Sequence, residues 1–178
     1  YSCAYFNNGA DGLEEAQRSK MELLCRKLDL RSSDRLLDIG SGWGGLARFA
    51  AERYGCEVTG VNISREQLRF SREFCRGLPV RFEERDYRDI EGRYDKIVSV
   101  GMFEHVGWKN YRAFMETVRR CLAEGGIFLL HTIGAPVSNR GVGPWFNRYI
   151  FPNSMLPSVA QLAKAAEGLF VIEDWHNL

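Results

Sequence analysis

The hydrophobic and polar positions of the chain follow two periods, one typical of strands and one typical of helices. Short runs rich in apolar and β-branched residues, which favour strands, occupy 35–39, 57–63, 80–84, 94–100, 127–133 and 170–175. Elsewhere apolar residues recur every three or four positions, which is the period of a helix face. This second pattern predicts helices at 13–28, 44–54, 65–76, 111–122 and 159–166, and an aromatic, proline-bounded loop at 144–157.

Strands that alternate with helices predict an α/β fold, a doubly wound and mostly parallel sheet with helices on both faces. No linker, repeat or change of composition divides the sequence, so we expect one domain over 1–178. In such sheets ligands bind beyond the carboxyl ends of the strands. Residues that follow strand ends are therefore the first site candidates, at 38–45, 62–64, 86–87, 101–105 and 131–134.

Composition narrows the classes of function. The 178 residues are 45% hydrophobic and 26% charged, values typical of a soluble globular domain. The net charge of +1 does not favour nucleic acid as a partner. No apolar run approaches the roughly 20 residues of a membrane span. Five scattered cysteines without C-x-x-C spacing predict reduced thiols rather than disulfides or a zinc site, and we expect no metal.

A glycine-rich turn follows the first predicted strand. The sequence at 35–45 is RLLDIGSGWGG, in which Asp38 precedes Gly40 and Gly42. Glycine lacks a Cβ, so a nucleotide-like cofactor can approach the bare backbone of such a turn. The spacing departs from the G-x-G-x-x-G of dinucleotide sites. An ordinary strand-to-helix turn is the alternative interpretation.

Two more strand ends carry residues suited to a nucleoside. A nicotinamide site would show an acid after the second strand, but Asn62 stands there; its amide can still bond ribose hydroxyls. Ser64 and Gln67 have the spacing of a capping box for the next helix. After the third strand, Asp86 can accept from an exocyclic amine and Tyr87 can cover an adenine face. A polar turn is the alternative for this pair.

Seven motifs together resemble a known family. They are YSCAY at 1–5, LDIGSGWGG at 37–45, GVNISREQ at 60–67, DYRD at 86–89, VSVGMFEHVG at 98–107, FLLHTIG at 128–134 and NRYIFPN at 147–153. They resemble the cyclopropane-fatty-acyl-phospholipid synthases, which with the mycolic acid cyclopropane synthases are S-adenosylmethionine-dependent enzymes of the class I methyltransferase fold. The resemblance covers nearly the whole chain, and GMFEHVG and LLHTIG are more specific than the glycine turn.

The resemblance implies that S-adenosylmethionine is the cosubstrate and that 1–178 is a methyltransferase domain. The family's cofactor contacts fall on Tyr1, Ser2, Gly40, Ser41, Gly42, Asn62, Ile63, Ser64, Gln67, Tyr87 and Arg88. Asp38 and Asp86 join this set because they lie at strand ends. Ser41 replaces a frequent cysteine of the family and Asn62 a frequent threonine. Both replacements are small and polar, so we expect cofactor binding to be kept.

The resemblance also implies the reaction. A methylene passes from the cofactor to the cis double bond of an unsaturated phospholipid acyl chain and a cyclopropane ring forms, with bound bicarbonate as the base. The bicarbonate contacts fall on Cys3, Glu104, His131 and Ile133, with Cys3 and Ile133 acting through backbone N–H groups. A helix-capping Glu104 and a strand-end His131 without catalytic roles are the alternatives. We interpret His105 as structural.

Two other functions stay open at this point. One is a methyltransferase that stops after methyl transfer, although the retention of Cys3, Glu104 and His131 argues against it. The other is a catalytically silent lipid- or cofactor-binding module. The family comparison predicts a C-terminally truncated chain that lacks the last strand of the sheet. The open edge would leave it prone to association, for instance as a homodimer.

A row of four arginines, the arginine stripe, is a candidate for binding a lipid surface. Arg65, Arg69, Arg72 and Arg76 share one face of a predicted helix. A solvated face is the plain interpretation; a seat for anionic headgroups, worth about 1 kcal/mol per basic residue, is the sharper one. The aromatic loop at 144–157 either admits an acyl chain or packs on the sheet. The resemblance implies a cytoplasmic enzyme, peripheral to the inner face of the membrane.

Overall fold

A five-stranded parallel sheet forms the centre of the molecule. The computed structural model describes residues 2–6, 12–139, 141, 143–149 and 154–177. The strands are β1 (Arg35–Ile39), β2 (Glu57–Asn62), β3 (Val80–Glu84), β4 (Tyr94–Val100) and β5 (Leu122–His131). Their order is β3-β2-β1-β4-β5, and every neighbouring pair is parallel. The predicted parallel α/β sheet is confirmed.

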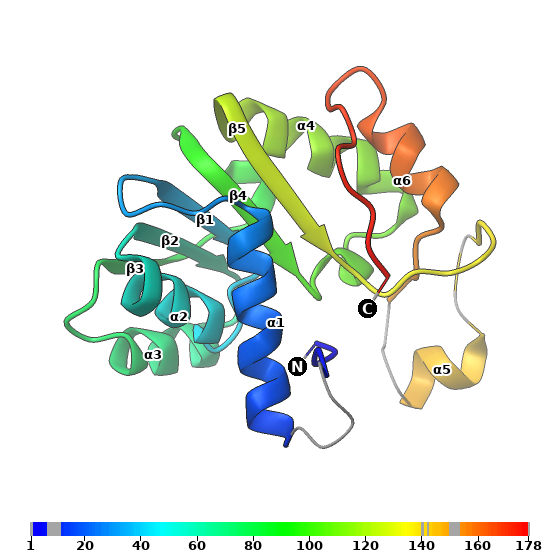
Figure 1. Cartoon of the computed structure of the whole chain (residues 1–178). Coiled ribbons are helices and arrows are strands. Elements are labelled where there is room, and N and C mark those ends of the chain that lie inside the picture. Colours follow the sequence, from blue (N-terminus) through cyan, green and yellow to red (C-terminus); the bar gives the residue numbers. More distant parts are fainter. Residues whose placement is uncertain (1, 7–11, 140, 142, 150–153, 178) are drawn as a thin grey trace.

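Helices cover both faces of this sheet (Figure 1). One face carries α1 (Leu13–Lys27), α2 (Gly45–Tyr54) and α3 (Arg65–Phe74), and the other carries α4 (Tyr111–Cys121) and α6 (Val159–Ala166). Successive strand residues point to opposite faces. Leu36 therefore belongs to the buried cluster under α2 and α3, whereas Leu37 belongs to the cluster that contains Phe114 of α4. The sheet is doubly wound, as expected.

The strand order places a switch point between β1 and β4. From β1 the chain moves outward to β2 and β3, and then returns to add β4 on the other side of β1. In sheets of this kind ligands bind beyond the carboxyl ends of the strands, near such a point. Three short 3-10 helices follow strand ends nearby, at Tyr87–Asp89, Phe103–His105 and Trp108–Asn110.

The last strand differs from the prediction at both ends. Pairing with β4 begins at Tyr94 with Leu122 and resumes at Lys96 with Ile127, so residues 123–126 form a bulge. Gly125, with φ of 70°, lies in that bulge. The glycine pair therefore interrupts β5 instead of preceding it. The strand ends at His131, which leaves Ile133 in the loop beyond it.

The predicted strand at 170–175 is wrong. Phe170 packs on Phe128 of β5 with ring centroids 5.8 Å apart, but Val171, Ile172 and Trp175 are at least half exposed. Asp174 pairs with Lys27 of α1. The segment is held at these points by side chains and forms no ladder with β5, although its apolar composition is typical of a strand.

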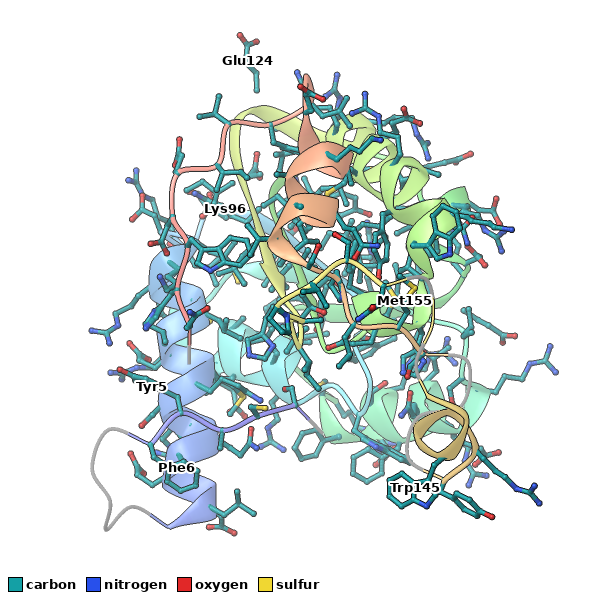
Figure 2. All side chains as sticks on the ribbon, turned by 90° about the vertical axis from the view of Figure 1, so that its right-hand side faces the viewer. Tyr5, Phe6, Lys96, Glu124, Trp145 and Met155 are labelled. Atoms are coloured by element: carbon teal, nitrogen blue, oxygen red, sulfur yellow. The ribbon has the colours of Figure 1, made fainter. Side chains whose placement is uncertain are left out.

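The predicted loop at 144–157 contains a short helix, α5 (Pro144–Tyr149). Proline at the first helical position fixes φ at a helical value without losing a hydrogen bond, which explains the start. Trp145 and Tyr149, four residues apart, are 65% and 62% exposed, with ring centroids 6.0 Å apart. Figure 2 shows Trp145 at the periphery of the molecule. The side chain of Phe146 and residues 150–153 lie outside the described part.

Candidate functional site

The glycine turn is anchored to the neighbouring strand β2. The N–H groups of Gly40 and Ser41 both donate to the carbonyl of Val61, at 2.9 and 3.1 Å. Gly40 has φ of 84°, and a Cβ there would lie 2.6 Å from the Cβ of Met102. Gly42 has φ of 54°, and a Cβ there would meet nothing within 4 Å. The turn therefore offers bare backbone to open space at Gly42.

Asn62 links this turn to the start of α3. Its side-chain amide donates to the Gln67 side chain at 2.7 Å and to the Gly42 carbonyl at 3.4 Å. Its side-chain oxygen accepts from the N–H of Ser64 at 3.1 Å. A ribose hydroxyl would therefore have to share or displace these bonds. Ile63, between Asn62 and Ser64, is 73% exposed.

The predicted capping box at Ser64 is only half formed. The Ser64 hydroxyl accepts from the N–H of Gln67 at 3.4 Å, as a cap should. The Gln67 side chain does not return to the N–H of Ser64, because Asn62 already occupies both groups. A complete capping box exists instead at Ser158 and Gln161, at the start of α6.

Asp86, Tyr87 and Arg88 form a turn after β3. The Asp86 carboxylate accepts from the Arg88 N–H at 2.9 Å and from its guanidinium at 2.8 and 2.7 Å. These bonds, with Arg88 as the main cause, lower the pKa of Asp86. Tyr87 is half-buried against Phe114, with ring centroids 5.2 Å apart. The Asp86 carboxylate, which we expect to accept from the adenine amine, thus already accepts from Arg88.

Asp38 lies at the centre of the sheet, between Gly60 of β2 and Val98 of β4. The residue is 2% exposed, and burial raises the pKa of its carboxyl to about 7. An ionised Asp38 therefore costs free energy in the folded protein unless a cation approaches it. The cationic ammonium group of an amino-acid ligand would meet that need.

The N-terminal segment is fastened to α1. Tyr1 lies outside the described residues. The Ser2 hydroxyl accepts from Lys20 Nζ at 2.7 Å, and the Ser2 carbonyl accepts from the Gln17 amide at 3.2 Å. The Ser2 Cβ also lies 3.5 Å from the place where Gly101 would carry a Cβ. Ser2 therefore lies beside the end of β4, although the two are 99 positions apart along the chain.

Glu104 and Ile133 meet directly beyond the ends of β4 and β5. The Ile133 N–H donates to Glu104 Oε1 at 2.7 Å, and Glu104 is 6% exposed. The Glu104 carbonyl accepts from the N–H of Met155 at 2.7 Å, and Figure 2 labels Met155 in this region. Glu104 Oε2 is buried without a hydrogen-bond partner. The Ile133 N–H, which we expect to donate to bicarbonate, therefore donates to Glu104 in this structure.

His131 completes this group at the end of β5. Its carbonyl accepts from the Gly101 N–H at 3.0 Å, and its Nδ1 is buried without a partner. Burial is the main cause that lowers the pKa of His131; the charge of Lys20 adds to it and that of Glu104 opposes it. The imidazole is therefore neutral near pH 7. Cys3 is exposed, and in the described part of the chain it bonds neither Glu104 nor His131.

The sequence patterns and the resemblance did not predict two residues near this group, Lys20 and Tyr111. Tyr111 stacks on Phe103 with ring centroids 4.3 Å apart, and its buried hydroxyl has no partner. Burial, aided by Glu104, raises the pKa of Tyr111 to about 12. Lys20 is 7% exposed. Its position between Ala16 and Leu24, each one turn away on the apolar face of α1, is the signal that could have revealed it.

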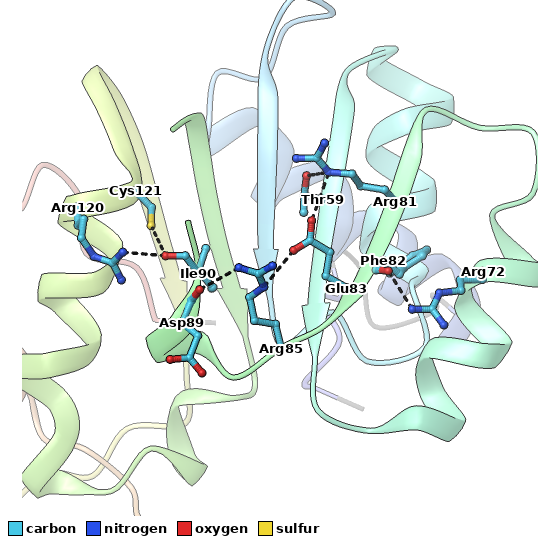
Figure 3. Close-up of polar contacts among 10 residues, drawn as sticks. All are labelled: Thr59, Arg72, Arg81, Phe82, Glu83, Arg85, Asp89, Ile90, Arg120 and Cys121. Atoms are coloured by element: carbon cyan, nitrogen blue, oxygen red, sulfur yellow. Dashed lines mark hydrogen bonds and ion pairs between the residues drawn. The ribbon is translucent and has the colours of Figure 1, made fainter. Parts of the chain in front are cut away.

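The predicted arginine stripe lies on α3, but each member has a protein partner. Arg65 pairs with Glu84 at 2.7 Å, Arg69 with Glu66 at 3.5 Å, and Arg76 with Glu73. Arg72 donates to the Phe82 carbonyl at 3.0 Å (Figure 3). Three of these side chains are more than 75% exposed. A headgroup would therefore compete with local acids, and the lipid role of the stripe stays a prediction.

A groove of about 460 Å³ lies against α1 and α2, lined by Arg18, Arg26 and Arg53 among others, and includes no predicted site residue. Within the described residues, no group of three or more His, Cys, Asp or Glu side chains could hold a metal. None of the described helices is long and apolar enough to cross a membrane.

Comparison with solved structures identifies the fold. The cyclopropane synthase MmaA2 from Mycobacterium tuberculosis superposes with a TM-score of 0.85 at 30% identity, over 93% of this chain and 64% of that one. The mycolic acid cyclopropane synthase CmaA1, solved with SAH and CTAB, gives 0.84 at 33% identity with the same coverage. The sheet and its helices are those of a class I methyltransferase.

Curated relatives agree with this. The cyclopropane-fatty-acyl-phospholipid synthase of Escherichia coli K12 is 54% identical over 99% of this chain and 46% of its own length. A probable fatty acid methyltransferase of Pseudomonas putida is 43% identical over 97% of this chain and 47% of its own. The chain thus spans about half the length of the relatives it matches. The family model described as mycolic acid cyclopropane synthetase matches residues 1–178, and the chain belongs to that family.

Proposed function

We propose that this chain carries the S-adenosylmethionine-binding part of a cyclopropane-fatty-acyl-phospholipid synthase. The full-length enzyme would transfer a methylene to the cis double bond of an unsaturated phospholipid acyl chain. One observation carries the proposal: the buried Glu104 has one oxygen bonded to the Ile133 N–H and the other without a partner, and the Nδ1 atom of His131 is also buried without a partner. The 54% identity to the Escherichia coli synthase supports the same reaction.

The cofactor would lie over the glycine turn. The open space at Gly42 fits the amino-acid and ribose parts of S-adenosylmethionine, whose ammonium would relieve the buried Asp38. Ser2, beside the end of β4, closes the site from the N-terminal side. Tyr87 offers a half-buried ring to the adenine. When bound, the cofactor supplies the one-carbon unit, and these residues hold and orient it.

The residues around Glu104 fit a small anion such as bicarbonate, which when bound supplies the base. Glu104 Oε2 can accept a hydrogen bond from its hydroxyl, and His131 Nδ1 can donate to its oxygens in the appropriate tautomer. Both atoms are buried without hydrogen-bond partners, which costs free energy unless a ligand supplies the missing bonds. The Ile133 N–H already donates to Glu104, so it can donate to the anion only in a bifurcated hydrogen bond.

The acyl substrate implies a lipid surface as the partner. We propose that the enzyme works in the cytoplasm against the inner face of the membrane, where the exposed Trp145 and Tyr149 of α5 are available to lipid. Assembly as a homodimer is part of the proposal. Crosslinking of the full-length protein, with and without vesicles, tests the homodimer and its association with the lipid surface.

A methyltransferase that stops after methyl transfer is the second candidate, favoured by the 43% identity to a probable fatty acid methyltransferase. Both reactions would start from the same cofactor and the same double bond. They differ in their products, because ring closure removes the vinylic protons and gives cyclopropane protons visible by NMR. In the second reaction the cation formed by methyl transfer would lose a proton from a neighbouring chain carbon instead of the new methyl group. A methyl-branched alkene without a ring would therefore support the second candidate.

Replacement of Glu104 by Gln in the full-length protein tests the proposed chemistry. The amide keeps the volume but removes the carboxylate, so we expect ring formation from an unsaturated phospholipid to fall at least about 100-fold, the usual scale for a lost acid–base group. Binding of S-adenosylhomocysteine should change less than about threefold. Glu124→Gln, at the exposed start of β5 and far from Met155 in Figure 2, is the matched control. Normal activity of Glu104→Gln would contradict the assignment.

A further inference from the structure

Lys20 is a buried cation without a protein counter-ion. It lies on the apolar face of α1 and is 7% exposed. Lysine is almost never buried to this degree unless it is paired. Within the described residues, no carboxylate lies at ion-pair distance from Lys20; its ammonium donates to the neutral groups of Ser2 and Gln17. A buried charge in this position needs an anion to offset its lost hydration.

The contacts of Lys20 place its ammonium at the candidate site. Nζ donates to the Ser2 hydroxyl at 2.7 Å and to Gln17 Oε1 at 2.6 Å. An ammonium has three N–H donors, so one is left for a ligand. Ser2 adjoins Gly101, and the Gly101 N–H is bonded to the His131 carbonyl. The ammonium is thus connected to the ends of β4 and β5 through two neighbouring residues.

The electrostatics agree with this placement. Burial lowers the pKa of Lys20, while Cys3 opposes that effect. The charge of Lys20 in turn helps to lower the pKa of His131. The positive charge therefore reaches the region where Glu104 and His131 have unpartnered polar atoms.

We propose that Lys20 is an anion-binding residue of this site, which holds a carboxylate-type anion against the Ser2 segment. The inference rests on the proposed function and extends it, because Lys20 belongs to none of the predicted contacts. The anion has two sources of the same chemistry, the amino-acid carboxylate of the cofactor and bicarbonate. In either case the ammonium donates to a carboxylate oxygen in a charge-assisted hydrogen bond.

The test compares two ligands in wild type and Lys20→Met. Calorimetry measures binding of S-adenosylhomocysteine and of its decarboxylated analogue, and turnover of the full-length protein is measured against bicarbonate concentration. Lys20→Arg retains the charge, so it should restore most of the effect. Lys27→Met, on the same helix but paired with Asp174, is the matched control.

Two results support the proposal and identify the anion. A loss of at least tenfold in affinity for S-adenosylhomocysteine, with the decarboxylated analogue unaffected, assigns Lys20 to the cofactor carboxylate. Unchanged affinity for both ligands, with at least a tenfold rise in the bicarbonate concentration for half-maximal turnover, assigns it to bicarbonate. Equal weakening of both ligands, or no change in any of the three measurements, overturns the proposal.

A measurement on the wild type covers the case in which Lys20→Met does not fold. The ε-carbon resonance of Lys20, followed by NMR against pH, should show a higher pKa once S-adenosylhomocysteine or bicarbonate is added. No rise with either ligand overturns the role of Lys20. A wild type that does not bind S-adenosylhomocysteine at all refutes the proposed function itself, so the two failures are distinguishable.

Discussion

Asp38 makes the stability of the fold depend on pH. Its folded pKa of about 7 lies above the ordinary value of 3.8, so the folded state binds the proton more tightly than the unfolded state. The free energy of unfolding should therefore fall as pH rises from about 4 through 7, by up to about 4 kcal/mol. Urea unfolding at pH 5 and pH 8 measures most of this loss, about 3 kcal/mol.

The Asp38→Asn variant should lose most of this pH dependence, because the amide does not ionise. The exposed Asp89→Asn, which lies near the end of β3, should keep the wild-type dependence. Equal stability of the wild type at the two pH values would show that the Asp38 carboxyl is not desolvated as the structure indicates.

A substitution at Gly42 should affect stability, through its positive φ, and cofactor affinity, through the added methyl, by different amounts. Gly42→Ala should cost about 1–2 kcal/mol in stability, because φ is positive but the new methyl meets no atom within 4 Å. Affinity for S-adenosylhomocysteine should fall at least tenfold, because the methyl enters the space proposed for the cofactor. Calorimetry and urea unfolding give the two numbers.

Gly55→Ala is the matched control, since its φ of 71° imposes a similar backbone penalty at the end of α2. It should lose stability but keep the affinity. Gly40→Ala should be the most destabilised of the three, because its methyl would lie 2.6 Å from Met102. If Gly42→Ala and Gly55→Ala bind the cofactor equally well, the cofactor does not lie over Gly42.

At the residue scale the resemblance predicts which residues belong to the site, and the structure adds how they contact one another. The resemblance led to Glu104, His131 and Ile133, and the structure brings Glu104 and Ile133 into direct contact. It did not reveal that the Ile133 N–H is used by Glu104, or that Lys20 is buried. The bond between Ile133 and Glu104 joins two segments far apart in the sequence, and no local period encodes such a contact. The apolar period of α1 could have indicated that Lys20 is buried, but not that its ammonium reaches Ser2.

At the scale of elements, α3 starts with a network centred on Asn62 instead of a simple capping box. Ser64→Ala removes one cap bond and should cost about 1 kcal/mol. Asn62→Ala should cost more, about 2 kcal/mol, because it leaves the Ser64 N–H and the Gln67 side chain without partners. Urea midpoints of the two variants rank them. A larger loss for Ser64→Ala would contradict the network.

Periodic elements were predicted well and interrupted ones poorly. The strands β1, β3 and β4 have the predicted bounds, because buried apolar runs with clear ends carry a strong signal. The strand β5 contains a glycine bulge, and Phe170–Trp175 has strand composition without a paired neighbour. In these two places tertiary contacts decide the conformation, and a single sequence does not contain them in readable form.

At the scale of the whole molecule, the alternation of strands and helices was enough to predict the doubly wound sheet. Right-handed crossovers leave few ways to arrange such a chain. The exposed residues are harder to interpret. Trp43, Phe70 and Phe74 form an exposed aromatic row over α3, with ring centroids 5.4 and 5.5 Å apart along it. The relatives are about twice as long as this chain, and the reaction is therefore proposed for the full-length protein.

Calorimetric titration of S-adenosylhomocysteine into this chain, beside the full-length protein, tests the central claim most directly. The glycine turn, Asp38 and Ser2 all lie within the chain, so we predict saturable one-to-one binding by both forms. Gly42→Ala should weaken the binding in both. Absence of binding by both forms would contradict the assignment of the strand ends as a cofactor site.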